Sequence, residues 1–137
     1  MKKFIAIVLC TILFVGVFNT SVFASEANDG IMPRFNNVGL IDSSFAIIDG
    51  EAIVLVSYMG YPGITMGAKI TTQLQKRSFL FFWSDVTEWV DVSDEEDAMF
   101  EHSYPVSSGT YRVKIKYEIS GTGGATDVVE DELQDSY

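Results

Sequence analysis

Strict alternation of apolar and polar side chains over ten residues is the feature that most restricts the fold of this chain. In residues 110–119 every second position is Tyr, Val or Ile, and Arg, Lys or Glu stand between them. A period of two places the two sets on opposite faces of a β-strand, whereas a helix requires a period of 3.6. Five apolar residues on one face predict an antiparallel sheet with one buried and one solvent-facing side.

Several shorter segments show the same pattern. Residues 44–48 and 51–58 are rich in Ile, Val and Phe and are separated by Asp49-Gly50, a two-residue turn typical of a hairpin. Further strands are expected over residues 68–76, 86–92, 98–104 and 126–129. No segment has a helical period. About seven short strands separated by turn residues predict an all-β protein, an immunoglobulin-like antiparallel β-sandwich.

The N-terminal segment has the composition of a signal peptide. Lys2 and Lys3 precede an apolar run over residues 4–18, and the segment ends with Val22-Phe23-Ala24. The alternative is that this segment is retained as an anchor. We expect a secreted, extracellular protein with four parts: a signal peptide over 1–24, a flexible leader over 25–37, the sandwich domain over 38–130 and an acidic tail over 131–137.

The charge of the exported part excludes some partners. Residues 25–137 carry 7 basic and 19 acidic side chains, a net charge of -12. Nucleic-acid binding requires clustered Lys and Arg, and anionic membrane surfaces repel net negative charge. We therefore expect no nucleic-acid partner, and no membrane partner after signal cleavage.

The chain offers few groups for catalysis. Its one cysteine, Cys10, lies inside the apolar run, so the exported part has no thiol for a disulfide, a metal or a nucleophile, and we expect no lipid attachment there. Its one histidine, His102, belongs to no nucleophile elbow, phosphate loop or His-Glu-Xaa-Xaa-His motif. We predict a non-catalytic protein.

An acidic run before residue 98 is the one candidate for a cofactor, because hard oxygen ligands suit calcium. It lacks the spacing and the glycine of an EF-hand, and a solvated acidic turn is the preferred interpretation. The carboxylates concerned are Asp91, Asp94, Glu95, Glu96 and Asp97.

Five consecutive large apolar residues, Phe-Leu-Phe-Phe-Trp, occupy positions 79–83. Because successive strand residues face opposite sides, they cannot all enter one core. Three interpretations are open: an internal strand covered on both faces, a protein-contact surface, or an aromatic platform for sugar rings. The candidate ligand-surface residues are Phe81, Trp83, Trp89, Tyr58 and Tyr61.

One local pattern sharpens the fold prediction. The sequence Ser-Ser-Gly-Thr-Tyr-Arg-Val over 107–113 resembles the tyrosine corner of immunoglobulin-like sandwiches. In that resemblance the Tyr111 hydroxyl bonds a backbone group near Ser107. Val113 takes the place of the cysteine that antibody domains carry.

Residues 74–77, Leu-Gln-Lys-Arg, followed by Trp83 and Trp89, extend the resemblance. Over about residues 40–130 the chain resembles small secreted Gram-positive proteins with an immunoglobulin-like or fibronectin type III-like sandwich and no assigned function. The resemblance implies fold and location but no activity. We expect a binding or structural module whose partner is a protein, contacted through the edge at residues 79–83 or through the acidic face. The alternative is a carbohydrate or cell-wall glycan module that uses exposed aromatic residues.

Overall fold

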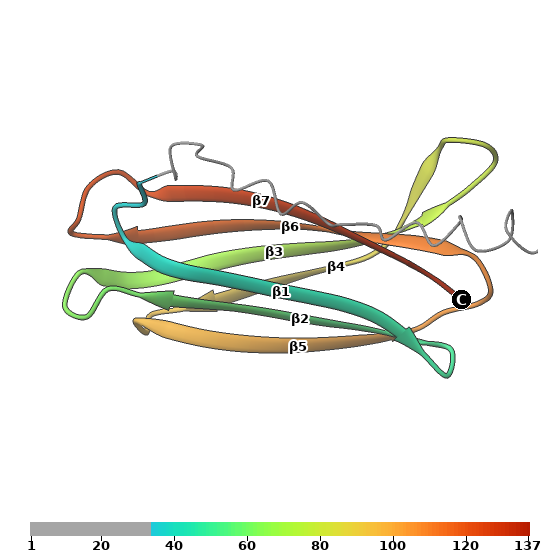
Figure 1. Ribbon diagram of the computed structural model, residues 1–137, viewed down its shortest axis with the longest axis horizontal. Coiled ribbons are helices and arrows are strands. Elements are labelled where there is room, and N and C mark those ends of the chain that lie inside the picture. The colour runs from blue at the N-terminus through green and yellow to red at the C-terminus, as the bar shows by residue number, and fades with distance from the viewer. Residues whose placement is uncertain (1–33) are drawn as a thin grey trace, which may run out of the picture. The chain divides into compact units, whose positions relative to one another are not determined.

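The computed structural model describes residues 34–137, so the predicted signal peptide over 1–24 and the predicted leader up to residue 33 lie outside the described residues. Residues 34–137 contain seven strands. Within these residues no helix is long and apolar enough to cross a membrane. The strands are β1 (Val38–Ile48), β2 (Glu51–Gly60), β3 (Thr65–Arg77), β4 (Trp83–Ser93), β5 (Asp97–Pro105), β6 (Thr110–Gly121) and β7 (Asp127–Ser136), as labelled in Figure 1.

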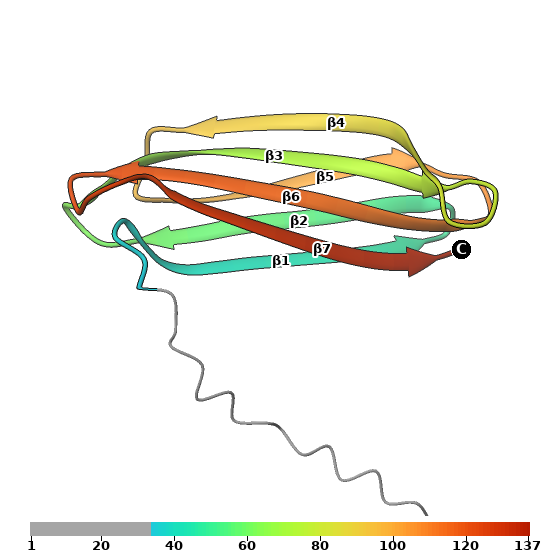
Figure 2. The ribbon, with the colours of Figure 1, turned by 90° about the horizontal axis from the view of Figure 1, so that it is seen from above.

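The strands form two antiparallel sheets that lie face to face, one behind the other in Figure 2. One sheet has three strands in the order β1-β2-β5, and the other has four in the order β4-β3-β6-β7. The structure confirms the predicted immunoglobulin-like antiparallel β-sandwich of seven strands.

The core lies between the sheets, and the alternating pattern builds it. All five apolar residues of the 110–119 segment are buried in β6, the second strand from one edge of its sheet. The register of β3 and β6 places Ile70 opposite Tyr117 and Leu74 opposite Val113. The facing sheet contributes Val54 and its neighbours on β2.

Two predicted turn features are present. Asp49 and Gly50 have φ angles of 52° and 80°, so both central residues of the β1–β2 turn are left-handed, as a tight two-residue hairpin requires. The Tyr111 hydroxyl donates a hydrogen bond of 2.8 Å to the Ser107 carbonyl, which is the bond expected of a tyrosine corner.

Two predicted boundaries are wrong. The acidic tail predicted over 131–137 is the second half of β7, which continues to Ser136 because Asp131, Leu133 and Asp135 alternate with outward residues and face the other sheet. The leader predicted to end at residue 37 ends earlier, because Asn37 is fully buried and its amide donates to the carboxylate of Asp127.

Candidate functional site: an aromatic loop at one end of the sandwich

A short loop joins β3 to β4 at the end of the sandwich that also holds the β1–β2 turn and the C-terminus. We call residues 78–82 of this hairpin the aromatic loop. Figure 1 shows it bending away from both sheets (yellow-green). The hairpin therefore presents the loop beyond the body of the sandwich.

Hydrogen bonds within the hairpin hold the aromatic loop in one conformation. The Ser78 amide and hydroxyl both donate to the Phe82 carbonyl, at 2.8 and 3.0 Å. The Arg77 Nε donates to the Leu80 carbonyl at 2.8 Å. These bonds pair polar groups inside the turn, so the apolar side chains are left on its outside.

All four apolar residues of the aromatic loop face solvent. The exposed fractions of Phe79, Leu80, Phe81 and Phe82 are 80, 58, 78 and 71%. The interpretation of this run as an internal strand covered on both faces is therefore wrong. The run breaks the period of two and forms the turn itself, where no neighbouring strand covers it.

Leu80 adopts a φ of 60°, in the left-handed region that glycine occupies at little cost. A leucine here costs about 1 kcal/mol or more in backbone strain. Its side chain is 58% exposed, so packing against the described residues covers less than half of it. A strained, exposed apolar residue points to a role outside the fold.

Three cations lie at the base of the aromatic loop, each against an aromatic ring, and we call Lys76, Arg77 and Arg112 the cationic base. The Arg77 guanidinium carbon lies 5.9 Å from the centre of the Phe81 ring. The Arg112 guanidinium carbon lies 4.4 Å from the centre of the Trp83 ring, and the Lys76 ammonium 5.3 Å from the centre of the Tyr111 ring. Tyr and Trp rings favour cations over their faces.

The five predicted ligand-surface residues do not form one surface. Phe81 and Trp83 lie at the loop end, whereas Tyr61 lies in the β2–β3 loop at the opposite end. Tyr58 is only 3% exposed, and its hydroxyl donates to the Glu95 carbonyl at 2.8 Å. Trp89 packs against the core. Tyr58 is therefore closed to a ligand, and Trp89 is only partly accessible.

The calcium candidate residues are also not gathered at one point. The Asp91 carboxylate is hydrogen bonded to His102, and the Glu96 carboxylate accepts from the Gly63 amide at 2.5 Å. Within residues 34–137 no three His, Cys, Asp or Glu side chains are grouped so that they could hold a metal ion.

His102 lies between the sheets at the β4–β5 edge. Its Nε2 lies 2.7 Å from the Asp91 Oδ2, and its ring stacks on that of Trp89 with centres 4.9 Å apart and an angle of 8°. An acyl-transfer triad would add a nucleophile hydrogen bonded to the imidazole. In the described part of the chain no Ser or Thr hydroxyl makes that bond.

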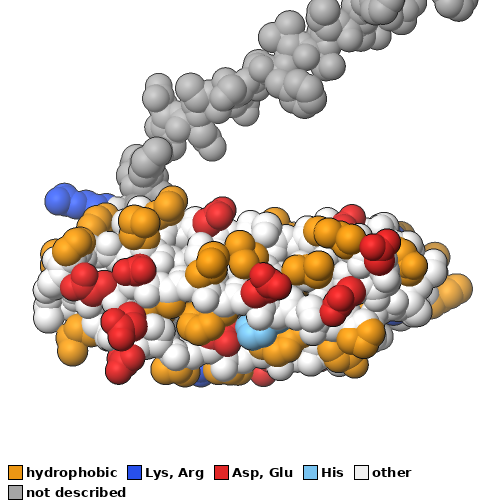
Figure 3. Space-filling model, turned by 90° about the horizontal axis from the view of Figure 1, so that it is seen from below, with side chains coloured by type: hydrophobic (Ala, Val, Ile, Leu, Met, Phe, Trp, Pro, Cys, Tyr) orange, Lys and Arg blue, Asp and Glu red, His pale blue; other side chains and the backbone are white. Residues whose placement is uncertain are grey.

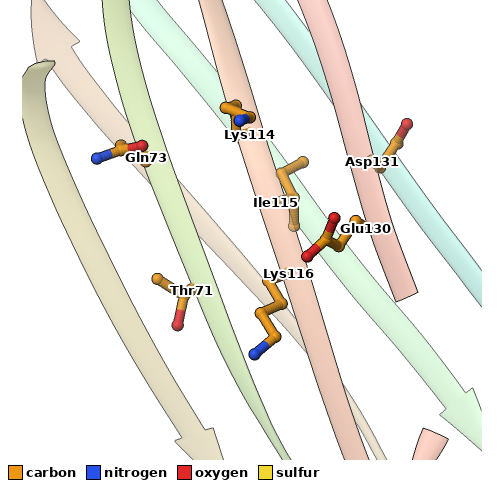
Figure 4. A pocket seen from close by; sticks show the side chains of 7 residues that line it. All are labelled: Thr71, Gln73, Lys114, Ile115, Lys116, Glu130 and Asp131. Atoms are coloured by element: carbon orange, nitrogen blue, oxygen red, sulfur yellow. The ribbon is translucent and has the colours of Figure 1, made fainter. Parts of the chain in front are cut away.

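A hollow of about 190 Å³ lies over β3, β6 and β7. Figure 4 shows Lys114, Lys116 and Glu130 around it together with Thr71 and Gln73. In the register of β6 and β7, Lys116 stands opposite Glu130, and Lys114 opposite Glu132. These charges are matched in cross-strand pairs, so the hollow has no excess charge for an ionic ligand.

The outer side of the three-stranded sheet carries scattered apolar residues. Figure 3, which views the molecule from the β5 side, shows hydrophobic and acidic side chains interspersed, with Lys and Arg only at the margins. Met59 and Met99 are the most exposed apolar residues of β2 and β5. Acidic side chains interrupt this surface, whereas the four apolar residues of the aromatic loop are consecutive.

The sequence analysis singled out the whole run over residues 79–83 as a possible contact surface, but it placed the run on a strand and did not consider Arg112. A signal for the loop residues was present, because a run without alternation between two alternating segments marks a turn. No sequence signal places Arg112 on Trp83, because the two residues are brought together by the register of β3 with both β4 and β6.

Neither a protein-family model nor a curated protein sequence matches this chain. Among solved structures, the chain is similar to wild-type OgpA from Akkermansia muciniphila at 9% identity and a TM-score of 0.45, over 74% of this chain and 30% of that one. It is similar to catalytically inactive OgpA in complex with an O-glycopeptide (glycodrosocin) substrate at 8% identity and a TM-score of 0.43, over 72% and 29%. The chain therefore spans less than a third of those proteins. Similarity at this level carries no inference about the activity of this chain.

Proposed function

We propose that this chain is a secreted, non-catalytic binding module that contacts its partner through the aromatic loop. The observation that carries the proposal is the exposure of four consecutive apolar residues on a hydrogen-bonded turn. Contiguous exposed apolar surface marks interaction sites in soluble proteins. A turn held by its own hydrogen bonds also loses little conformational freedom on binding. The family resemblance supports secretion and an immunoglobulin-like module.

A glycan partner receives less support from the geometry. A sugar platform needs free aromatic faces, and Arg112 lies over the ring of Trp83. Of the other predicted platform residues, Tyr58 is buried, Trp89 is partly buried with its ring stacked on His102, and Tyr61 lies at the opposite end.

The test is retention of the chain on purified cell wall, insoluble polysaccharide and a membrane fraction. The loop variant combines Phe79→Ser, Phe81→Ser and Phe82→Ser. The control combines Met59→Ser and Met99→Ser, which remove exposed apolar side chains elsewhere. We expect retention on at least one material that the loop variant loses and the control keeps. Equal retention of all three proteins, or retention on none of the materials, would contradict the proposal.

The variant Trp83→Ala distinguishes a glycan partner from a partner that binds the aromatic loop. If this variant loses retention on polysaccharide while the loop variant keeps it, the chain is a glycan module with Trp83 as its contact. Both results are read from the same sedimentation assay.

A further inference from the structure

The shape of the aromatic loop indicates what kind of partner it meets. A flat protein interface covers one face of a contact residue and leaves the other against its own chain. Here all four side chains are more than half exposed, on a turn that projects beyond the sheets. Such a projection is fully covered only when it inserts into a surrounding apolar phase. The hydrocarbon of a bilayer provides one without a matching pocket.

The residue below the tip is of a type that membrane interfaces favour. Trp83 begins β4 directly after the loop and is partly exposed. Trp and Tyr are enriched at the headgroup level, where one end of the ring is apolar and the other is wet. Phe and Leu at the tip, with Trp at the base, follow the order of polarity across one leaflet.

Two cations without an ion-pair partner among the described residues stand next to the tip. In residues 34–137 neither Lys76 nor Arg77 lies within ion-pair distance of a carboxylate, whereas Arg112 shares its charge with Glu132 at 3.2 Å. The acidic β4–β5 loop, with Asp94, Glu95 and Glu96, lies at the other end of the sandwich. Lys76 and Arg77 are therefore the cations next to the tip that a lipid phosphate would meet first, although the same end of the sandwich also carries Asp49, Glu51 and Asp85.

We infer that the aromatic loop inserts into the outer leaflet of a lipid bilayer, with the cationic base at the level of the phosphates. This inference rests on the proposed function and names its partner. It replaces the expectation, based on a net charge of -12, that no membrane is bound. That expectation treats the charge as uniform, whereas phosphates within a Debye length of the loop meet mainly the charges near them.

The experiment uses the full chain with Cys10→Ser and one new thiol that carries an environment-sensitive fluorophore. The thiol is placed at the tip by Leu80→Cys, or at the opposite end by Glu95→Cys as the matched control. Vesicles contain phosphatidylcholine alone or phosphatidylcholine with phosphatidylglycerol. Because the fluorophore reports its own surroundings, binding by residues 1–24 does not produce the signal at the tip.

We expect a blue shift and an intensity increase at position 80 on adding either vesicle, and none at position 95. Adding Phe79→Ser, Phe81→Ser and Phe82→Ser should raise the lipid concentration at half-maximal change by at least about tenfold. Arg77→Gln should raise it by about fivefold for vesicles with phosphatidylglycerol and leave phosphatidylcholine unchanged.

No change at position 80 with either vesicle would overturn the inference, as would equal changes at positions 80 and 95. A concentration-dependent blue shift without lipid would overturn it in favour of a second copy of this chain. If the vesicles have no effect but the loop-dependent retention on cell wall persists, the bilayer is excluded and the proposed binding function stands.

Discussion

At each long edge of the sandwich an edge strand of one sheet faces an edge strand of the other, and we call each of these two places a seam. The two seams are held together by different contacts. We call the seam between β1 and β7 the aspartate seam, because Asp127, Asp131 and Asp135 face inward at intervals of four along β7. Asp127 accepts from the amides of residues 36–38, Asp131 from the Ser43 hydroxyl and Asp135 from the Ile47 amide. At the second seam, β4 and β5 meet through Trp89, Asp91 and His102.

The difference shows how the backbone hydrogen-bonding groups of an edge strand find partners. The amides of an edge strand lack a neighbouring strand, and at the aspartate seam carboxylates of the other sheet take part of that role. At the second seam the contact is between side chains only. The aspartate seam should therefore contribute more to stability and to protecting the edge backbone.

The largest expected effect is at Asp127, which accepts hydrogen bonds from three successive amides at 2.6 to 3.1 Å. Asp127→Ala should lower the free energy of unfolding by about 3 kcal/mol or more, because the amides of Asn37 and Val38 remain buried without partners. Urea denaturation measures the change. Glu130→Ala, on the outward face of β7, should change it by less than about 0.5 kcal/mol. Similar losses of unfolding free energy in the two variants would show that the Asp127 carboxylate does not stabilise the aspartate seam.

Alkaline pH should weaken the aspartate seam. Burial, followed by the nearby Asp131 carboxylate, raises the pKa of Tyr117 to about 12, and its hydroxyl donates to the Asp42 carbonyl of β1 at 3.1 Å. An unfolded tyrosine ionises near pH 10, so between pH 10 and 12 the folded state holds a proton that the unfolded state has lost. Stability is full below pH 10 and should fall by about 1.4 kcal/mol per pH unit above it, up to pH 12.

Tyr117→Phe is the control variant for the loss of stability between pH 10 and 12. It should reduce the slope of stability against pH between 10 and 12, leaving the smaller contribution of Tyr58, whose pKa burial also raises. Denaturation in urea at a series of pH values gives the slope. An unchanged slope in the variant would show that another group causes the alkaline loss.

The second seam should respond more weakly. His102→Ala removes the ring stacked on Trp89 and the partner of Asp91, and we expect a loss of about 1 to 2 kcal/mol. His102→Phe keeps an aromatic ring and should restore about half of that loss. Thermal denaturation at neutral pH compares the two. Equal losses would mean that the hydrogen bond to Asp91, and not the stacking, closes this seam.

The smallest effect is expected at Asp135, which accepts a single bond of 2.7 Å from the Ile47 amide in a partly buried place. Asp135→Ala should cost about 1 kcal/mol. Hydrogen exchange of the Ile47 amide gives the local measurement and should become faster in the variant. An unchanged exchange rate would show that this carboxylate does not protect the edge of β1.

Much of the fold follows from periodicity. The alternation over residues 110–119 and the Asp49-Gly50 turn predict a buried β6 face and the β1–β2 hairpin, because both depend on neighbours along the chain. The candidate site was only partly predictable. The run over 79–83 was recognisable as unable to enter one core, but whether it lies inside or outside depends on what the other strands cover.

The errors concern residues whose environment is set by distant strands. Asp131 and Asp135 belong to a strongly acidic segment and were interpreted as a solvated tail, because charged residues are rarely buried. The Ser43 hydroxyl and the Ile47 amide of β1, which donate hydrogen bonds to these two carboxylates, are each 88 residues away from their acceptor in the chain.

By itself, the sequence determines most of the strand content, the buried face of the strands with clear alternation and the tight turn at residues 49–50, since these depend on side-chain alternation and local backbone preference. Only the tertiary structure decides that the aspartates of β7 close a seam, that Arg112 covers Trp83 and that the aromatic loop projects into solvent. These features depend on which strands become neighbours and at what register, and that is set by packing over the whole sandwich.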